Sequence, residues 1–307
     1  MKSIKIASGA GYAGDRIEPA IDVMLNGNID YISFECLAER TIAIAQQEKQ
    51  KDPRKGYNSL LEYRFSKILP ICCDKKIKVI TNMGAANPLS AIEKIKELCE
   101  SLNIHGLKLA AVLGDDISNK LDQYLDYEIL ELKKPLSSIK DQLISANVYL
   151  GAEGIVEALK NGADIVVTGR CSDQAIFMAP EFGWNFEDYD KIGKGIMLGH
   201  LLECGAQVSG GYFSVPGYTE VENLWNIGFP IAEVSEDGKV ILSKTETSGG
   251  LINKDTCKEQ LIYEIHDPKN YITPDGVADF TTISITELGK NKVLLEGATG
   301  KSKTETL

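Results

Sequence analysis

Short apolar runs rich in β-branched residues alternate, over the first two-thirds of the chain, with segments whose apolar residues recur three and four positions apart. Such alternation predicts parallel strands joined by crossover helices. A charged stretch at 49–57, which contains Pro53 and Gly56, predicts a surface loop within this pattern. The predicted strands are 3–8, 29–34, 77–81, 107–113 and 163–168; the predicted helices run to about 26, through 45, over 90–102 and over 151–160.

The pattern changes near residue 210, where glycine-containing turn pairs begin to separate short predicted strands at 239–242, 282–285 and 292–295. We therefore expect two parts. Residues 1–209 are predicted to form an α/β ligand-binding domain with a Rossmann-like, doubly wound, mostly parallel sheet, and 210–307 a β-rich α+β part. The last residues carry no helix or strand pattern. We therefore expect a truncation at this end, as in a fragment of a longer protein.

The 307-residue chain is acidic, with 44 aspartates and glutamates against 33 lysines and arginines and a net charge of -11. A surface that binds nucleic acid carries the opposite charge, so nucleic acid is not an expected partner. No uncharged apolar run reaches about 18 residues, and no signal-peptide pattern follows Met1, so we expect a cytoplasmic protein without a membrane partner. Seven cysteines without a C-x-x-C pair predict reduced thiols.

A G-x-G-x-x-G pattern, made by Gly9, Gly11 and Gly14, follows the first predicted strand, and Glu35 lies about twenty residues later. This spacing is typical of dinucleotide-binding folds. Pro19 would fall well inside a helix that began at the second glycine, so we expect the helix to start near Pro19 instead. Three interpretations stay open: a dinucleotide site, a site for another ligand that needs close backbone approach at Gly11, and a plain tight turn.

Charged residues gather where the first two predicted strands end. Asp15 and Arg16 lie on the loop after the first strand, and Glu35 and Glu39 leave the second strand four positions apart. If the helix already includes these positions, the two carboxylates share one face close to Arg40. Either Arg40 pairs with one acid on a solvated helix start, or the group performs acid–base work or binds a metal.

Further strands end in polar, charged or glycine residues rather than in neutral turns. Since the carboxyl ends of parallel strands lie at one edge of a sheet, this repetition predicts the rim of an active site. The small residues after the third strand would let an anion approach backbone N–H groups. The candidate ligand-binding residues of these strand ends are Asn82, Gly84, Asn87, Asp115, Asp116, Gly169, Arg170 and Asp173.

A predicted helix around 199–207 places His200, Glu203, Cys204 and Gln207 in one stripe. The H-x-x-E-C order resembles a zinc motif, but a cysteine replaces a histidine ligand and no partner glutamate is evident. The stripe therefore predicts either a buried polar helix contact or a catalytic group. The catalytic group would be a Cys–His nucleophile pair or a His–Glu acid–base pair.

Three separated cysteines, Cys36, Cys171 and Cys204, each lie next to a predicted strand end or site helix. They could hold an iron–sulfur cluster, although their spacing matches no cluster motif. Free buried cysteines are the alternative. Cofactor and metal dependence stay open at this point.

Seven segments together resemble the acyclic terpene utilisation family: GAGYAGDRIEPA, DYISFECLAERT, ITNMGAANP, GADIVVTGR, GHLLECGAQVSGGYF, GFPIAEV and YITPDGVADF. The resemblance runs from Gly9 to about Gly300. It implies a catabolic setting, the bacterial breakdown of citronellol- and geraniol-type acids through their acyl-thioesters. Many members continue into a further C-terminal segment. Cys36 and Cys204 lie inside the family's motifs, whereas the position of Cys171 is often apolar, which disfavours the cluster.

The working hypothesis is a lyase or hydratase that acts on a small branched carboxylate or its acyl-thioester. Such chemistry needs a proton shuttle and an anion clamp, and no serine elbow or phosphate-binding loop of the Walker type competes with it. Arg16, Arg40 or Arg170 would hold the carboxylate, and Glu39 or His200 would move the proton. The alternatives are a non-catalytic ligand-binding subunit of a multi-protein enzyme and an NAD(P)-dependent oxidoreductase. A partner subunit or a homo-oligomer is compatible with each.

Overall fold

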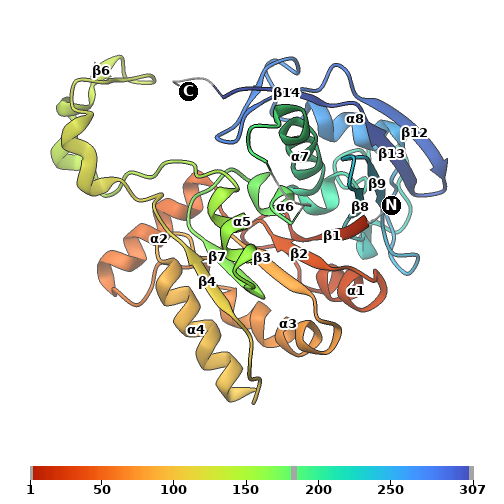
Figure 1. Ribbon diagram of the computed structural model, residues 1–307, viewed down its shortest axis with the longest axis horizontal. Coiled ribbons are helices and arrows are strands. Elements are labelled where there is room, and N and C mark those ends of the chain that lie inside the picture. The colour runs from red at the N-terminus through yellow and green to blue at the C-terminus, as the bar shows by residue number, and fades with distance from the viewer. Residues whose placement is uncertain (1–2, 181–184, 304–307) are drawn as a thin grey trace.

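The computed structural model describes residues 3–180 and 185–303 and is built around one large sheet (Figure 1). The strand order is β12-β13-β9-β8-β1-β2-β3-β7-β4. The five strands at one end run parallel, and β7 is buried along its whole length, as a strand covered on both faces must be. They are β1 (Ser3–Ala10), β2 (Tyr31–Phe34), β3 (Lys78–Thr81), β7 (Ile165–Thr168) and β4 (Leu109–Val112).

Helices cover both faces of this parallel part. Three of the helices that follow β1, β2 and β3 pack into a single core on one face, whereas the helix at 39–51 packs in a smaller cluster with Leu37, Ala85 and Ala86. The helices after the return from β4 belong to the core on the other face. On the first side lie α1 (Glu18–Asn26), α2 (Glu39–Lys51), α3 (Leu61–Lys75) and α4 (Pro88–Ser101). On the second lie α5 (Glu153–Lys160), α6 (Ala175–Met178), α7 (Tyr189–Leu202) and α8 (Lys254–Ile262).

The C-terminal part continues the same sheet, because β8 pairs antiparallel with β1 and places Ala232 opposite Ile6. The strands added here are β8 (Ile231–Ser235), β9 (Val240–Ser243), β13 (Lys292–Glu296) and β12 (Ser284–Gly289). A small sheet of β10 (Tyr271–Ile272), β11 (Val277–Asp279) and β14 (Thr299–Lys301) lies against α7. Its approach requires glycine in α7, because a Cβ on Gly193 would lie 2.3 Å from the carbonyl oxygen of Thr299.

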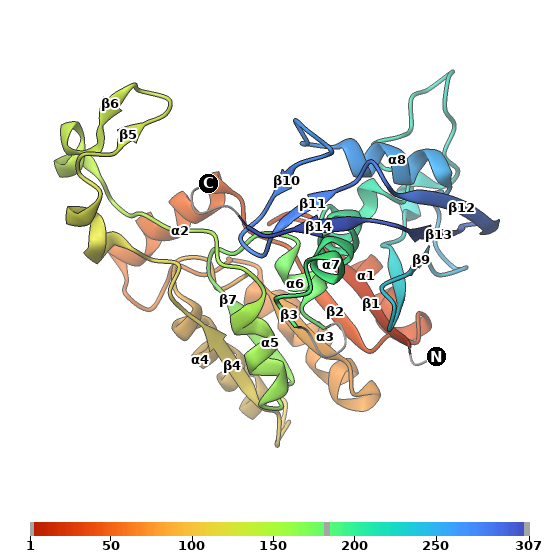
Figure 2. The same ribbon diagram turned by 45° about the horizontal axis from the view of Figure 1, so that its top comes forward.

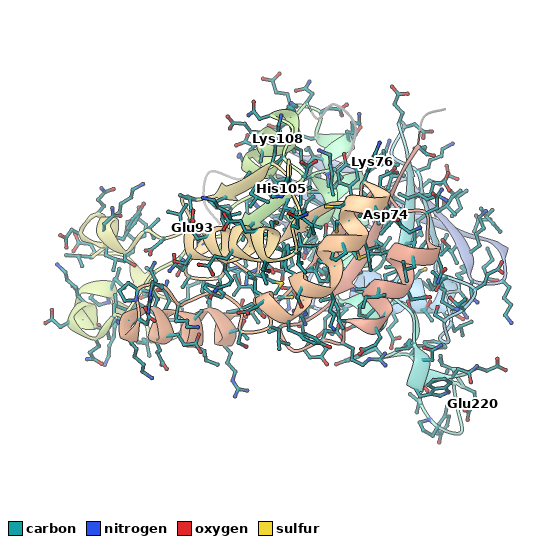
Figure 3. The ribbon with its side chains drawn as sticks, turned by 90° about the horizontal axis from the view of Figure 1, so that it is seen from below. Asp74, Lys76, Glu93, His105, Lys108 and Glu220 are labelled. Carbon is teal, nitrogen blue, oxygen red and sulfur yellow. The ribbon has the colours of Figure 1, made fainter. Side chains whose placement is uncertain are left out.

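Residues 116–147 form an arm that projects from the body beside β4 (Figure 2). The arm contains the two-residue strands β5 (Glu128–Ile129) and β6 (Lys134–Pro135), and no residue of it is buried. Its short helical turns are η1 (Ser118–Gln123), η2 (Leu136–Ser138) and η3 (Lys140–Gln142). Outside the arm, single turns lie at η4 (Gly205–Gln207) and η5 (Leu224–Asn226). A second, smaller projection has Glu220 near its tip (Figure 3).

Several local predictions are confirmed. The first helix begins at Glu18 with Pro19 in its first turn, where the missing proline N–H leaves no bond unmade. The α/β class and the mostly parallel core are also confirmed. The Rossmann-like detail is not confirmed, since β1, β2 and β3 follow one another across the sheet without the reversal next to β1 that a dinucleotide-binding sheet has.

Two helix boundaries differ from the predictions. Ala38 is extended and α2 begins only at Glu39, so Glu35 and Glu39 do not share a helix face. Helix α7 ends at Leu202, and Gly205 has a positive φ of 55°, so the predicted helical stripe through Gln207 is interrupted. A whole helix, α3, was not predicted. No helix in the described part of the chain is long and apolar enough to cross a membrane.

Candidate functional site

The candidate site lies where the direction of the chain changes between neighbouring strands. After β3 the chain enters α4 on one face of the sheet, whereas after β7 it enters α6 on the other. The two connections therefore diverge at the carboxyl ends of β3 and β7, the kind of position where open α/β sheets bind ligands. Their first residues pack closely, which Gly84 permits, because a Cβ there would lie 2.4 Å from the carbonyl oxygen of Thr168.

Glu35 lies buried beside these strand ends, directly after β2. Its Oε1 accepts hydrogen bonds from the backbone N–H of Leu37 at 2.8 Å and from the Asn82 amide at 3.0 Å. The Asn82 carbonyl oxygen accepts in turn from the N–H of Cys36 at 2.7 Å. Burial, helped by the nearby charge of Asp173, raises the pKa of Glu35 well above its ordinary value.

Arg170 follows β7 and ties the site together. Its guanidinium donates to the carbonyl oxygens of Leu37 at 2.6 Å and of Cys171 at 2.7 Å, and it forms an ion pair with Asp173. The aromatic ring of Tyr149 lies over the guanidinium, 4.5 Å from centroid to carbon. Because its donors already have partners, Arg170 positions its neighbours rather than clamping a substrate carboxylate.

Asp115 supports Arg170 from the neighbouring strand end. Its Oδ2 accepts from the backbone N–H of Arg170 and from the Asn147 amide, both at 2.9 Å. Gly169 is required here, because a Cβ at this position would lie 2.6 Å from the same carboxylate oxygen. Hydrogen bonds through Asp115 thus join two neighbouring strand ends, and they form a layer beneath the site.

Asp173 is the site carboxylate that water reaches. It lines a cavity of about 430 Å³ together with Tyr149, Gln174 and Tyr271, and its side chain is 37% exposed. Dense surroundings desolvate the carboxylate even though the cavity is open. This desolvation, opposed by Arg170 and reinforced by the charge of Glu203, raises the pKa of Asp173 to about 7.

Tyr271, on β10, lines the same cavity as Asp173. Its hydroxyl oxygen accepts a hydrogen bond from the side-chain amide of Gln174, and among the described residues its O–H has no acceptor, so it can donate to a ligand. Burial and the charges of Glu203 and Asp173 raise the pKa of Tyr271, so the phenol stays protonated at neutral pH. A carboxylate and a phenolic donor therefore line one cavity.

His200 and Glu203 lie behind Tyr271. The His200 ring is 1% exposed and packs 5.2 Å from the ring centroid of Tyr271 and 5.8 Å from that of Phe280. Its Nδ1 lies 2.7 Å from Glu203 Oε1, but the ring N–H direction is not aligned with that oxygen. Within the described residues, both His200 nitrogens and Glu203 Oε2 lack hydrogen-bond partners, so this buried pair is polar and incompletely satisfied.

The glycine loop after β1 is packed against protein. Gly9 lies within β1, where a Cβ would lie 2.7 Å from the Phe34 ring. A Cβ on Gly11 would lie 2.4 Å from the backbone carbon of Cys204, so the expectation that Gly11 receives a ligand does not fit its surroundings. Gly14 is exposed, with the Tyr12 ring 3.5 Å from a Cβ position.

Several predicted ligand-binding residues have structural partners instead. Asp15 accepts from the N–H groups of Gly11 and Arg16, and the Arg16 guanidinium donates to the carbonyl oxygens of Trp225 and Ile227. Arg16 therefore anchors a C-terminal loop and is not a free anion clamp.

The remaining rim residues lie outside the cavity lining. Asn87 caps α4, and its amide donates to the carbonyls of Pro53 and Lys55. Asp116 accepts from the N–H of Ser118, and Arg40 is exposed on α2. These contacts account for Asn87 and Asp116 without a ligand.

Glu39 nevertheless reaches the site. The Tyr149 hydroxyl donates to its carboxylate, which lowers the pKa of Glu39, and the same bond and burial raise the pKa of Tyr149 to about 12. Glu39 thus holds the ring that covers Arg170. Its lowered pKa favours a positioning role over the proton transfer that the sequence suggested.

The thiols do not form a shared site. Burial raises the pKa of both Cys36 and Cys171 to about 12 and also raises that of Cys204. No group of three or more histidine, cysteine, aspartate or glutamate residues with metal-binding geometry occurs within 3–180 and 185–303.

Residues 4–307 match the model of the acyclic terpene utilisation family protein AtuA. The chain belongs to the AtuA family. The match spans both the parallel and the antiparallel parts of the sheet, so the site and the strands that extend its sheet lie within one family unit. This membership suggests a role in acyclic terpene utilisation. Neither a curated protein nor a solved structure matches the chain.

Three site residues of this AtuA family member escaped the sequence reasoning. Tyr149 precedes α5, Gln174 precedes α6, and Tyr271 lies about a hundred residues further along the chain. None follows a motif of recognised spacing. Only Gln174 lies close to a predicted strand end. Its position next to Asp173 and four residues after Arg170 could have identified it as a site residue.

Proposed function

We propose that the protein catalyses a lyase or hydratase reaction on a branched acyl-thioester, with Asp173 as the general acid–base group. The observation that carries this proposal is the carboxylate of Asp173, whose pKa is raised to about 7 in the wall of an open cavity. A group with this pKa exchanges protons readily in both directions near neutral pH. Family membership supplies the branched, terpene-derived character of the substrate.

The charges around the cavity favour a thioester over a free carboxylate. Asp173, Glu203 and Glu35 interact electrostatically within the site, and the single nearby guanidinium of Arg170 is already bonded to protein. The carboxylate of a free-acid substrate would be repelled by these three acidic side chains. An acyl-thioester carries no charge at its reacting carbons.

Hydration would proceed across a carbon–carbon double bond conjugated with the thioester carbonyl. Ionised Asp173 takes a proton from water as the water oxygen bonds to the β-carbon, and the electron pair of the double bond moves to the carbonyl oxygen. The Tyr271 O–H donates a hydrogen bond to that developing oxyanion. Asp173 then returns the proton to the α-carbon, and the reverse sequence eliminates water.

The surrounding residues would set this chemistry in place. Arg170 orients the Asp173 carboxylate, and Tyr149 covers Arg170. The charge of Glu203 helps to keep the pKa of Asp173 high, and the His200 ring lies beside Glu203 behind the cavity, with its Nδ1 2.7 Å from the Glu203 carboxylate. Each role follows from a contact or charge effect within the site.

The test is a hydration screen with branched α,β-unsaturated acyl-thioesters and the corresponding free acids. Asp173→Asn should lower turnover by about 10²–10⁴-fold, the range for loss of a positioned acid or base. Tyr271→Phe should lower it by about 10²–10³-fold with a smaller change in KM. Asp116→Asn removes an exposed carboxylate outside the cavity and should match wild type.

Thioester binding without turnover in the isolated protein, with turnover only after a second subunit is added, would instead favour the ligand-binding subunit. Full activity in folded Asp173→Asn protein would refute the assigned role of Asp173.

A further inference from the structure

The arm at 116–147 carries many apolar side chains among charged ones but has no core of its own. It contains leucine, isoleucine and tyrosine side chains throughout, yet none of its residues is buried. Tyr127, Leu130 and Leu132 near its tip are 67%, 71% and 50% exposed. A hairpin with two-residue strands is marginally stable in water by itself, so this segment needs a surface to pack against.

The strand at the base of the arm presents an open edge. Within the described residues, β4 pairs only with β7 and is the last strand of the sheet. The carbonyl oxygen of Lys108 accepts from β7-side N–H groups, so Leu109, Ala111 and Leu113 direct their backbone groups outward by strand alternation. Neither a charged side chain nor a proline within Leu109–Val112 blocks this edge.

We propose that a second copy of this chain pairs with β4 in antiparallel orientation, across a two-fold axis at Ala111, and that each arm packs on the partner copy. Ala111 lies at the centre of the three outward-directed residues, so a two-fold axis there opposes Leu109 with Leu113 of the other copy. The sheets then join into one continuous sheet, and both open edges are removed.

Charge favours this self-pairing. Lys108 directly precedes β4, near His105, as Figure 3 shows from below, and Asp116 follows the other end of the strand. Antiparallel pairing about Ala111 brings the basic end of each strand alongside the acidic end of the other. The strand is thus complementary to a copy of itself.

The arm leaves from the carboxyl end of β4, so in the pair it lies beside the amino end of the second β4. The turn before that strand carries Leu102, an exposed apolar residue. Tyr127, Leu130 and Leu132 would lose their exposure on this surface. The arm also begins and ends at Asp115 and Asn147, which support Arg170, so pairing would steady the site without forming part of it.

Light scattering coupled to size-exclusion chromatography tests the assembly. Wild type should have twice the 33.6 kDa mass of the single chain. The exposed double variant Leu130→Asp/Leu132→Asp should fold with the circular dichroism spectrum of wild type but elute as a monomer, and its Tm should lose the dependence on protein concentration that a dimer shows. Ile262→Asp, which changes a residue 66% exposed on α8, should remain a dimer.

A cysteine at the axis tests the register. Opposed residues of a hydrogen-bonded antiparallel pair lie about 5.5 Å apart at Cα, within disulfide range. Ala111→Cys should therefore form a cross-linked dimer under mild oxidation, whereas Ile262→Cys and wild type should not. A monomeric wild type at tens of micromolar refutes the proposal. So does a dimer that survives the arm variant, or one that Ala111→Cys does not cross-link.

Discussion

Gly11→Ala should destabilise the fold, because Gly11 touches backbone rather than an open cavity. An added Cβ would lie 2.4 Å from the carbonyl carbon and 2.6 Å from the carbonyl oxygen of Cys204, and 2.7 Å from the nitrogen of Gly205. These are backbone atoms, which cannot move aside as a flexible side chain can. Either the end of β1 or the turn after α7 must therefore shift.

The overlap matches that of an overpacked core, which costs about 1–3 kcal/mol. For a chain of 307 residues this corresponds to a fall in Tm of about 2–5 °C. Because the turn carries Glu203 and Cys204, activity should also fall. Gly14→Ala is the matched control, since its Cβ would come no closer than 3.5 Å to the Tyr12 ring. Thermal unfolding followed by circular dichroism measures both variants, and a Gly11→Ala protein as stable as Gly14→Ala refutes the reasoning.

Two further predictions concern buried polar groups. If His200 and Glu203 act as one unit, His200→Gln and Glu203→Gln should each lower turnover by about 10²–10⁴-fold, and the double variant should be scarcely worse than either. If the two variants instead lose stability additively and keep normal kinetics, His200 and Glu203 contribute only to packing. The Asp275 carboxylate accepts from the Ala152 N–H at 2.8 Å, and burial raises its pKa to about 6. Since the folded state binds this proton more tightly than the unfolded state, Asp275 should make stability fall as pH rises from about 4 to 6. Asp275→Asn should reduce the slope of stability against pH in urea titrations, with Asp173 and Glu35 accounting for the part that remains, and an unchanged slope would show that Asp275 contributes nothing to it.

The order of strands and helices in the parallel part followed from periodicity, because each strand is a short apolar run between amphipathic helices. Pro19 even located a helix start. The continuation of the sheet through β8 could not be predicted, since nothing in a short strand after Gly210 identifies β1 as its neighbour. Helix α3 was not predicted although one of its faces is buried. Pro70 lies inside it, and a proline in the interior of a segment normally argues against a helix.

The candidate site, like the fold, could be predicted from the sequence only in part. Strand ends predicted Glu35, Asn82, Arg170 and Asp173 as one group, because the edge of a parallel sheet brings them together. Sequence could not show that each guanidinium nitrogen of Arg170 already bonds to the backbone carbonyls of Leu37 and Cys171 or to Asp173, because those contacts depend on the fold. It also could not supply Tyr271, which arrives from a separate small sheet.

The pH dependence of kcat/KM with a branched unsaturated acyl-thioester tests the central claim most directly. The account requires ionised Asp173, so kcat/KM should rise with pH and level off above an apparent pKa of about 7. Asp173→Asn should lose this limb together with most of the activity, while Asp116→Asn keeps both. A wild-type profile without an inflection near 7, or the same inflection at full activity in Asp173→Asn, would contradict the assignment of Asp173 as the acid–base group.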